Sequence, residues 1–190
     1  MESENEISTY LGQKGYTIYK NALEFDETNP DYVKALDSAS YHVQNLSISA
    51  WVKTTNAQGS IIHLRSSSGD YSWRTWRLGI NGGKAFVQVN DGGSTAVTHH
   101  SQNTVNDGEW HHVVGVINGD EKKLMIYIDG NLSGTYTSYT NPIDYTSVDE
   151  IYIGAFDATN VPFNGKIDEV RIYNKALSSS EVSTLYAGDL

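Results

Sequence analysis

Cysteine is absent from the 190 residues of this chain, and proline occurs only three times. Without cysteine the chain forms neither disulfides nor thiolate metal sites, which leaves its compartment open. No apolar run approaches the roughly 18 residues of a membrane-spanning helix. The N-terminal sequence MESENEIS also lacks the basic and apolar segments of a signal peptide. We therefore expect a soluble chain with no membrane insertion and no signal peptide within this sequence.

Basic residues are scarce as well. The chain has 13 Lys and Arg against 23 Asp and Glu, for a net charge near −10 and an isoelectric point near 4.9. A nucleic-acid partner requires a basic surface that neutralises phosphates, so the composition excludes nucleic acid. Divalent cations remain compatible with it, because carboxylate and carbonyl oxygens bind them.

What the chain does contain favours short strands and turns. An aromatic fraction of 11%, with 13 Tyr and 17 Gly, suits strands joined by glycine-rich turns better than a helical bundle. At 190 residues and 38% hydrophobic content, the chain is long enough for one domain with a sizeable core. We expect a single all-β domain over 16–190, preceded at 1–15 by a polar lead-in or a linker.

The clearest pattern lies in residues 107–130, DGEWHHVVGVINGDEKKLMIYIDG, which form two predicted strands joined by a polar turn. One face of the first strand carries residues at period two: Trp110, His112, Val114 and Val116. The other face carries Val113 and Ile117, so this strand is predicted to be buried on both faces. Asp129 and Gly130 tolerate positive φ, which predicts a turn and a second hairpin after them.

The remaining strands predict a two-sheet antiparallel sandwich. Residues 46–52 alternate in the same way, with Trp51 on the face opposite the aliphatic set. Short strands recur without helical periods, which indicates a β-sandwich or jelly roll. Ser178 and Glu181 fit a capping box, so one short helix is predicted near the C-terminus. The predicted core comprises Trp110, Val114, Val116, Ile126, Ile128, Val170 and Ile172.

Taken together, these segments resemble the laminin G-like jelly roll of the concanavalin A-like lectin/glucanase superfamily over residues 22–186. The resemblance rests on ALEFD (22–26), DYV (31–33), LSISAWVKT (46–54), RLGINGGK (77–84), DGEWHHVVGVI (107–117), LMIYIDGNLSGT (124–135) and FNGKIDEVRIYNKALSSSEVSTLY (163–186). It implies two antiparallel sheets packed face to face, often a structural calcium ion, and frequent service as a carbohydrate-binding or adhesive module in larger secreted bacterial proteins. Functions vary widely in the family, so the fold transfers better than the ligand.

A catalytic role is not expected. Hydrolases of the superfamily carry two glutamates and an aspartate at alternate positions of one strand, so that the carboxylates face one cleft. The patterns E-x-D-x-E and E-x-D-x-x-E do not occur here. Glu24 and Asp26 could share a strand face, but nothing completes the set. The adjacent histidines at 99–100 and 111–112 diverge from each other in a strand, so neither pair chelates a metal by itself.

The best candidate ligand site is the polar segment 66–76, SSSGDYSWRTW, which contains Tyr71, Trp73 and Arg74. Aromatic faces stack on the C–H surfaces of sugars, and a guanidinium donates hydrogen bonds to hydroxyls. We predict that these three residues bind carbohydrate. The alternative is that Trp73 anchors the loop by packing.

Asp168 is the starting point for a predicted metal site. Alternation places it on the inward face that Val170 and Ile172 share, where an ionised carboxylate requires a cation or hydrogen bonds. The alternatives are that Asp168 accepts hydrogen bonds from backbone amides at a bulge, or that it pairs with Lys166 or another cation.

The predicted ion is calcium, held between the acidic turn after the first strand and the penultimate strand. Calcium accepts six to eight oxygen ligands, including backbone carbonyls. The resemblance also implies a structural ion between these segments. We predict Asp26 and Asp168 as side-chain ligands, with Asn29 or Asp31 assisting.

The leading hypothesis is a non-catalytic carbohydrate-binding or adhesion module of a larger secreted or cell-surface bacterial protein. It is expected to be monomeric and stabilised by calcium, with a glycan or polysaccharide as its partner. The alternative is a structural spacer or protein-interaction domain that binds another surface protein and no sugar. A third hypothesis, a glycosidase or polysaccharide lyase with an unfamiliar site, differs from both because it would release products.

Overall fold

The structure is a computed structural model, and it describes residues 22–28, 31–66, 75–90, 96–137, 139, 142–145, 148–156 and 161–188. These residues form 12 β-strands, the 3₁₀ helix Ala39–Tyr41 and the α-helix α1, Ser179–Ala187. The predicted all-β class with one short C-terminal helix is confirmed. No helix within these ranges is long and apolar enough to cross a membrane.

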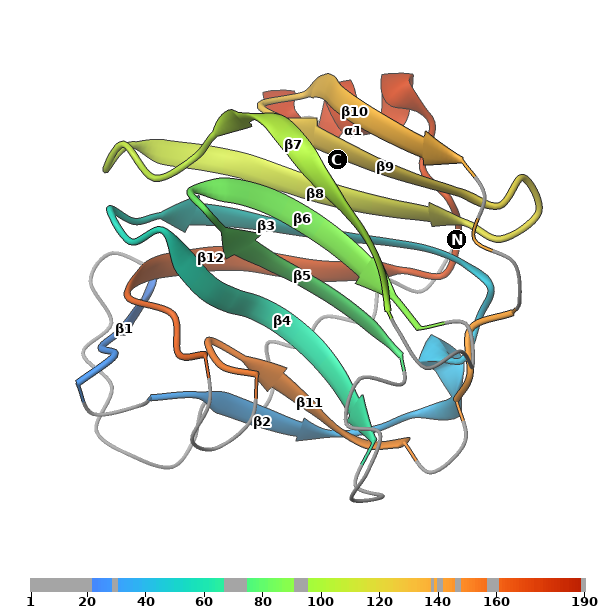
Figure 1. The fold of residues 1–190 in the computed structure, drawn as a ribbon, viewed down its shortest axis with the longest axis horizontal. Coiled ribbons are helices and arrows are strands. Elements are labelled where there is room, and N and C mark those ends of the chain that lie inside the picture. The colour runs from blue at the N-terminus through green and yellow to red at the C-terminus, as the bar shows by residue number, and fades with distance from the viewer. Residues whose placement is uncertain are drawn as a thin grey trace.

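The strands form two antiparallel sheets of six strands each, stacked face to face (Figure 1). The back sheet has the order β1-β12-β3-β8-β9-β10, with bounds Leu23–Phe25, Gly165–Tyr173, Asn45–Lys53, Trp110–Asn118, Lys123–Ile128 and Asn131–Thr137. The front sheet, nearer the viewer in Figure 1, has the order β2-β11-β4-β5-β6-β7, with bounds Val33–Leu36, Val148–Ile153, Gln58–Ser66, Trp76–Asn81, Lys84–Val89 and Val97–Thr104. Each sheet buries its inner face against the other, which is why the strands alternate aliphatic and polar residues.

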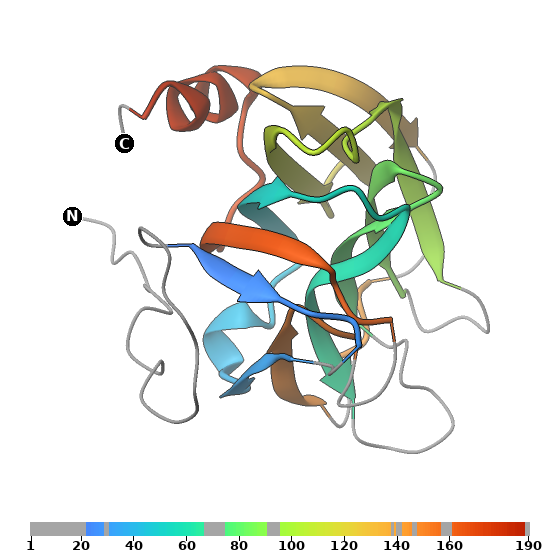
Figure 2. The same ribbon diagram turned by 90° about the vertical axis from the view of Figure 1, so that its left-hand side faces the viewer.

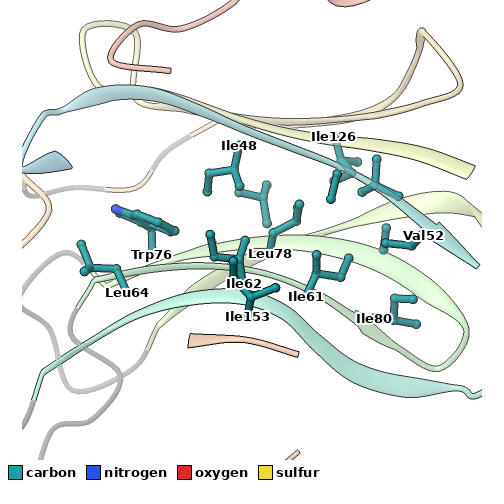
Figure 3. Close-up of a cluster of buried hydrophobic side chains, with 14 of the residues drawn as sticks. Ile48, Val52, Ile61, Ile62, Leu64, Trp76, Leu78, Ile80, Ile126 and Ile153 are labelled. Atoms are coloured by element: carbon teal, nitrogen blue, oxygen red, sulfur yellow. The ribbon is translucent and has the colours of Figure 1, made fainter. Parts of the chain in front are cut away.

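The core lies between the two sheets, as Figure 3 shows. The back sheet contributes Ile48, Val52 and Ile126, and the front sheet contributes Ile61, Ile62, Leu64, Trp76, Leu78 and Ile80. All nine are at most 2% exposed. Burying one such side chain contributes about 1.5–3 kcal/mol relative to leaving it in water, so this layer is the main source of stability.

The predicted hairpins at residues 107–137 are confirmed. Asn118 pairs with Lys123 across the turn between β8 and β9. Asp129 and Gly130 have φ of 50° and 75°, in the left-handed region, and they turn the chain into β10. The sequence Asp-Gly suits this turn because both residues tolerate positive φ.

Helix α1 packs on the outer face of the back sheet (Figure 2). The hydroxyl of Ser178 accepts a hydrogen bond from the Glu181 N–H at 3.3 Å, and the Glu181 carboxylate accepts one from the Ser178 N–H at 2.7 Å. The predicted capping box is therefore confirmed. The helix buries a cluster separate from the main core: Val114, Val116, Tyr127, Leu177, Val182 and Leu185.

The predicted core needs one correction, at Trp110. Strand β8 is buried on both faces as predicted, with Val113 in the main core and Val114 beneath α1. Trp110 is 36% exposed, however. It lies at the start of β8, two residues before His112. His112 is the outer-face residue on which Tyr186 of α1 stacks, so the helix does not extend over Trp110. The outer face of β8 is buried only where the helix covers it.

A β-bulge in β12 changes the face that Asp168 occupies. Glu169, with φ of 46°, and Val170 stand opposite a single residue of β3. Val170 and Ile172 pack against the main core as predicted, whereas Asp168 pairs with Trp51 on the outer face. The prediction that all three point inward is wrong, because one inserted residue inverts the alternation.

Candidate functional site

The outer face of the front sheet is the candidate site. Helix α1 occupies the corresponding face of the back sheet. Among the described residues, no α-helix covers the outer face of the front sheet.

Polar side chains cross this face in one row. The strand pairing aligns one residue from each of the six strands: Lys34, Tyr152, His63, Arg77, Gln88 and Thr98. Core residues flank the row, such as Ile62 and Leu64 around His63, so alternation turns its members outward. The row provides hydrogen-bonding groups at the spacing of neighbouring strands, about 4.8 Å.

Phe156, in the loop after β11, covers the centre of the row. Its ring stacks on His63 with 4.4 Å between centroids and 19° between planes. Nδ1 of His63 donates to the Phe156 carbonyl oxygen at 3.0 Å, which requires a proton on Nδ1. These contacts leave His63 2% exposed and fix its orientation.

The guanidinium of Arg77 lies over two phenyl rings. Its central carbon is 5.1 Å from the ring centroid of Phe86 and 5.0 Å from that of Phe156, which gives two cation–π contacts. Nε donates to the hydroxyl of Ser60 at 3.1 Å. Burial lowers the pKa of Arg77 to about 10, so the side chain remains a cation at neutral pH. Among the described residues it has no carboxylate partner.

A second set of polar groups lies beside the row, around Glu150. One carboxylate oxygen forms an ion pair with Lys34, and the other accepts a hydrogen bond from the Tyr152 hydroxyl at 2.6 Å. These contacts lower the pKa of Glu150. Arg65 pairs with Glu150 across the strands and lies 6.0 Å from the Tyr152 ring centroid. Its Nε is buried without an acceptor.

Cations predominate on this face. Strand register places four of the 13 Lys and Arg residues on it: Lys34, Arg65, Arg77 and Lys84. Glu150 is the one carboxylate among the described side chains of these strands. Among the described side chains of these strands, cations thus outnumber carboxylates, whereas the whole chain has 23 acidic residues against 13 basic ones.

The three predicted carbohydrate contacts lie outside the described residues: Tyr71, Trp73 and Arg74. The chain that contains them joins β4 to β5, the strands that contribute Arg65 and Arg77. Both arginines lie next to the strand ends that this segment connects. The carbohydrate contacts of these three residues therefore remain a prediction.

The structure does not bring the two main predicted calcium ligands together. Asp26 and Asp168 lie at opposite ends of the β1–β12 pairing, about four strand positions apart, or roughly 13 Å. Asp31 precedes β2, and Asn29 lies outside the described residues. Within the described ranges, no three His, Asp or Glu side chains group as a metal site.

The carboxylates of Asp26 and Asp168 both accept hydrogen bonds from neighbouring residues. Asp168 accepts one from the Glu169 N–H at 2.8 Å, which is the bulge contact expected as an alternative to calcium. Asp26 accepts from the N–H and the hydroxyl of Thr28, each at 2.8 Å. Because calcium also takes backbone carbonyl oxygens, the ion itself stays a prediction.

Sequence reasoning missed His63, Arg77 and Phe156. A local signal exists for the first two, since each polar residue stands between two aliphatic or aromatic core residues in a short strand. No such signal exists for Phe156, because its contact with His63 depends on the path of the loop after β11.

The stacked six-stranded sheets and the capped helix define a lectin-like β-sandwich. The chain belongs to the concanavalin A-like lectin/glucanases superfamily, whose family model matches residues 27–183. The resemblance expected from the sequence is thus confirmed. Human laminin subunit alpha-1 is 21% identical over 162 residues, which cover 83% of this chain and 5% of that protein. The chain thus corresponds to a small part of that relative.

Solved structures share the fold at low sequence identity. The Ruminococcus gnavus IT-sialidase module CBM40, bound to alpha2,3 sialyllactose, has a TM-score of 0.69 at 18% identity, over 90% of this chain and 100% of that one. The binding domain of Paraclostridial Mosquitocidal Protein 1 has a TM-score of 0.68 at 14% identity, over 88% of this chain and 43% of that one. At such identities the likeness concerns the fold alone.

Proposed function

We propose that this chain is a non-catalytic carbohydrate-binding module that binds a glycan on the outer face of the front sheet. The observation that carries the proposal is the polar row across all six strands. Lys34, Gln88 and Thr98 of this row reach the surface, whereas Tyr152, His63 and Arg77 are at most 7% exposed. Strands hold the accessible donors and acceptors in fixed positions, so a glycan that contacts them meets a preorganised surface. The module functions within a larger secreted or cell-surface protein.

Two further observations support the proposal. The fold is shared with a sialidase module that was solved with a bound sialylated sugar. The sequence between β4 and β5 contains Tyr71, Trp73 and Arg74, with aromatic rings of the kind that stack on sugars.

A glycan array with neutral, sialylated, sulfated and uronic-acid glycans tests the proposal, followed by calorimetry on the best ligand. Gln88→Ala removes a half-buried member of the row, and Thr135→Ala is its control on exposed β10 of the back sheet. We expect Gln88→Ala to weaken binding about two- to tenfold, as for one neutral hydrogen bond. Equal loss in both variants would contradict this site.

The predicted loop has its own test. Trp73→Ala is expected to reduce glycan affinity strongly while the melting temperature stays nearly unchanged. A large fall in melting temperature with intact binding would show that Trp73 is a packing residue.

Two assays separate the other hypotheses. Absence of binding to every glycan on the array, together with capture of a defined surface protein, would favour the hypothesis of a protein-interaction domain. Release of reducing ends or unsaturated products from polysaccharides would contradict the non-catalytic assignment.

A further inference from the structure

We propose that His111 is a proton-dependent clamp that closes one corner of the sandwich when it is protonated and releases that corner when it is neutral. The corner is the place where the bend at 107–109, before β8, meets the turn Asp129-Gly130 between β9 and β10. It belongs to the back sheet, whereas the candidate site belongs to the front sheet. The clamp therefore goes beyond the proposed function and does not depend on glycan binding.

The imidazole ring of His111 lies between two carboxylates. Its Nδ1 is 2.8 Å from Oδ2 of Asp129, and its Nε2 is 3.1 Å from Oδ1 of Asp107. A neutral imidazole has one N–H and can donate to only one of these oxygens, whereas the imidazolium ion donates to both. Between two ionised carboxylates, both contacts are hydrogen bonds only when each ring nitrogen carries a proton.

Backbone amides hold both carboxylates in an acceptor role. Oδ1 of Asp107 also accepts from the N–H of Glu109 at 2.9 Å, and Oδ1 of Asp129 accepts from the N–H of His112 at 2.9 Å. The amide of Glu109 first, and the ring of His111 second, lower the pKa of Asp107, so this group is an anion at neutral pH. The additional proton therefore belongs to the ring.

The surroundings of the ring favour its charged form. Burial opposes the charge, but the hydrogen bonds and the charges of Asp129 and Asp107 outweigh burial and raise the pKa of His111. On the neighbouring strand β3, His111 pairs with the apolar Val52, and Glu109, two residues earlier, is exposed. Among the described residues, no basic group acts on the ring.

The clamp supports the end of α1 through the turn that it holds. Asp129 and Gly130 both have positive φ, and the N–H of Asp129 donates to the carbonyl oxygen of His112 at 2.9 Å. Tyr186 lies directly on this turn, since a Cβ added at Gly130 would be 3.1 Å from its ring. When His111 loses its proton, one of the two carboxylates faces a ring nitrogen that cannot donate to it. The turn beneath Tyr186 is then held less firmly.

The direction of the pH effect follows from the raised pKa of His111. The stability that the clamp contributes is complete below about pH 6.5, the pKa of an unfolded histidine. It is lost as the pH rises through the folded pKa. His112 responds in the opposite sense, because burial lowers its pKa to about 4. The two neighbouring histidines therefore limit the pH range in which the corner is closed, His111 at its alkaline end and His112 at its acid end.

NMR of the histidine rings tests the protonation of the clamp, because the ¹⁵N shifts of the two ring nitrogens report which of them carries a proton. The wild type is titrated from pH 5 to pH 9, and His111→Gln identifies the resonance by its loss. We expect His111 to carry a proton on both nitrogens in the acid part of this range and to titrate with a midpoint above about 6.5. A midpoint at or below that value would overturn the proposal.

Aspartate variants assign the effect to the two carboxylates. Asp107→Asn and Asp129→Asn each remove a negative charge and retain an oxygen that accepts the backbone N–H, and each should lower the midpoint of His111. Asp120→Asn is the matched control, because Asp120 is an exposed aspartate at the opposite end of the β8–β9 hairpin. It should leave the midpoint unchanged. Equal midpoints in the wild type and all three variants would show that the carboxylates do not hold the proton.

Amide hydrogen exchange tests whether the proton closes the corner. After correction for the base-catalysed intrinsic rate, the protection of the His112 and Asp129 amides should fall about two- to tenfold as the pH rises through the His111 midpoint. This is the range for the loss of one partly exposed, charge-assisted hydrogen bond. In His111→Gln the protection should be low throughout and show no step. Wild-type protection that does not change across the midpoint would overturn the clamp, and it would leave the proposed glycan binding untouched.

Discussion

The indole ring of Trp51 stacks on the phenol ring of Tyr186, with 5.6 Å between ring centroids and 25° between planes. Trp51 lies on the outer face of β3, and Tyr186 belongs to the last turn of α1. Val182 and Leu185 fix the helix through the apolar cluster. The stack therefore adds an aromatic contact with the back sheet to the apolar contacts of the last turn of α1.

Removing the Tyr186 ring should loosen this end of the helix. We expect Tyr186→Ala to lower the free energy of unfolding by about 1 kcal/mol or more, because an aromatic pair contributes about 0.5–1.5 kcal/mol beyond its buried area. Urea unfolding measures the change. Tyr186→Phe keeps the ring and should stay close to the wild type; an equal loss in both variants would show that the hydroxyl, and not the stack, stabilises the helix.

Truncating a side chain of the β8–β9 hairpin should destabilise the protein strongly when that side chain lies between the sheets, and weakly when it lies on the exposed part of the outer face. Ile126 is fully buried between the sheets, so Ile126→Ala should cost about 2–5 kcal/mol. Trp110 is 36% exposed, so Trp110→Ala should cost well under the about 3–5 kcal/mol of a core tryptophan. Chemical unfolding of both variants under one condition compares them. A larger loss at Trp110 would restore the original core assignment.

The parts of the fold that sequence predicts are those set by local patterns. Period-two alternation defines β8 and β9, the dipeptide Asp129-Gly130 defines the turn, and Ser178 with Glu181 defines the helix start. Each signal lies within a few residues of the element that it specifies.

The parts that sequence does not predict depend on distant segments. Trp110 and Val114 share a strand face, and only the extent of α1 decides that Val114 is buried and Trp110 is not. The bulge at Glu169 inverts the alternation that placed Asp168 inward. The polar row exists because six strands align one residue each, and register is not readable from any one strand.

Calcium binding remains a prediction, and the separation of Asp26 and Asp168 in the structure allows the two residues to be tested independently. We expect a higher melting temperature in millimolar calcium than in excess chelator, because an ion that binds only the folded state stabilises it. Asp26→Asn should abolish the difference. Asp168→Asn should retain it, because Asp168 lies about four strand positions away and already accepts the Glu169 N–H. Identical melting temperatures of the wild type with calcium and with chelator would contradict the ion.

The pH dependence of stability should reflect His112. The ring lies 5.2 Å from that of Trp51 and beneath Tyr186, with Nδ1 buried and unpartnered. Burial lowers the pKa of His112 to about 4, against the opposing charge of Asp129 and with a smaller effect of Arg171. The folded state thus holds this ring neutral, whereas the unfolded chain protonates it near pH 6.5.

The sign of the effect follows from the depressed pKa. The stability that neutral His112 contributes is complete above about pH 6.5. It is lost progressively as the pH falls to the folded pKa of about 4.

His112→Phe keeps a ring in the stack but cannot bind a proton, and the backbone N–H of residue 112 still donates to Asp129. Urea unfolding of both proteins at pH 7.5 and pH 4.5 isolates the histidine, because all other titrating groups are common to the pair. We expect the wild type to lose about 2–3 kcal/mol relative to His112→Phe between these pH values. An equal loss in the two proteins would mean that His112 takes up a proton in the folded state as readily as in the unfolded chain.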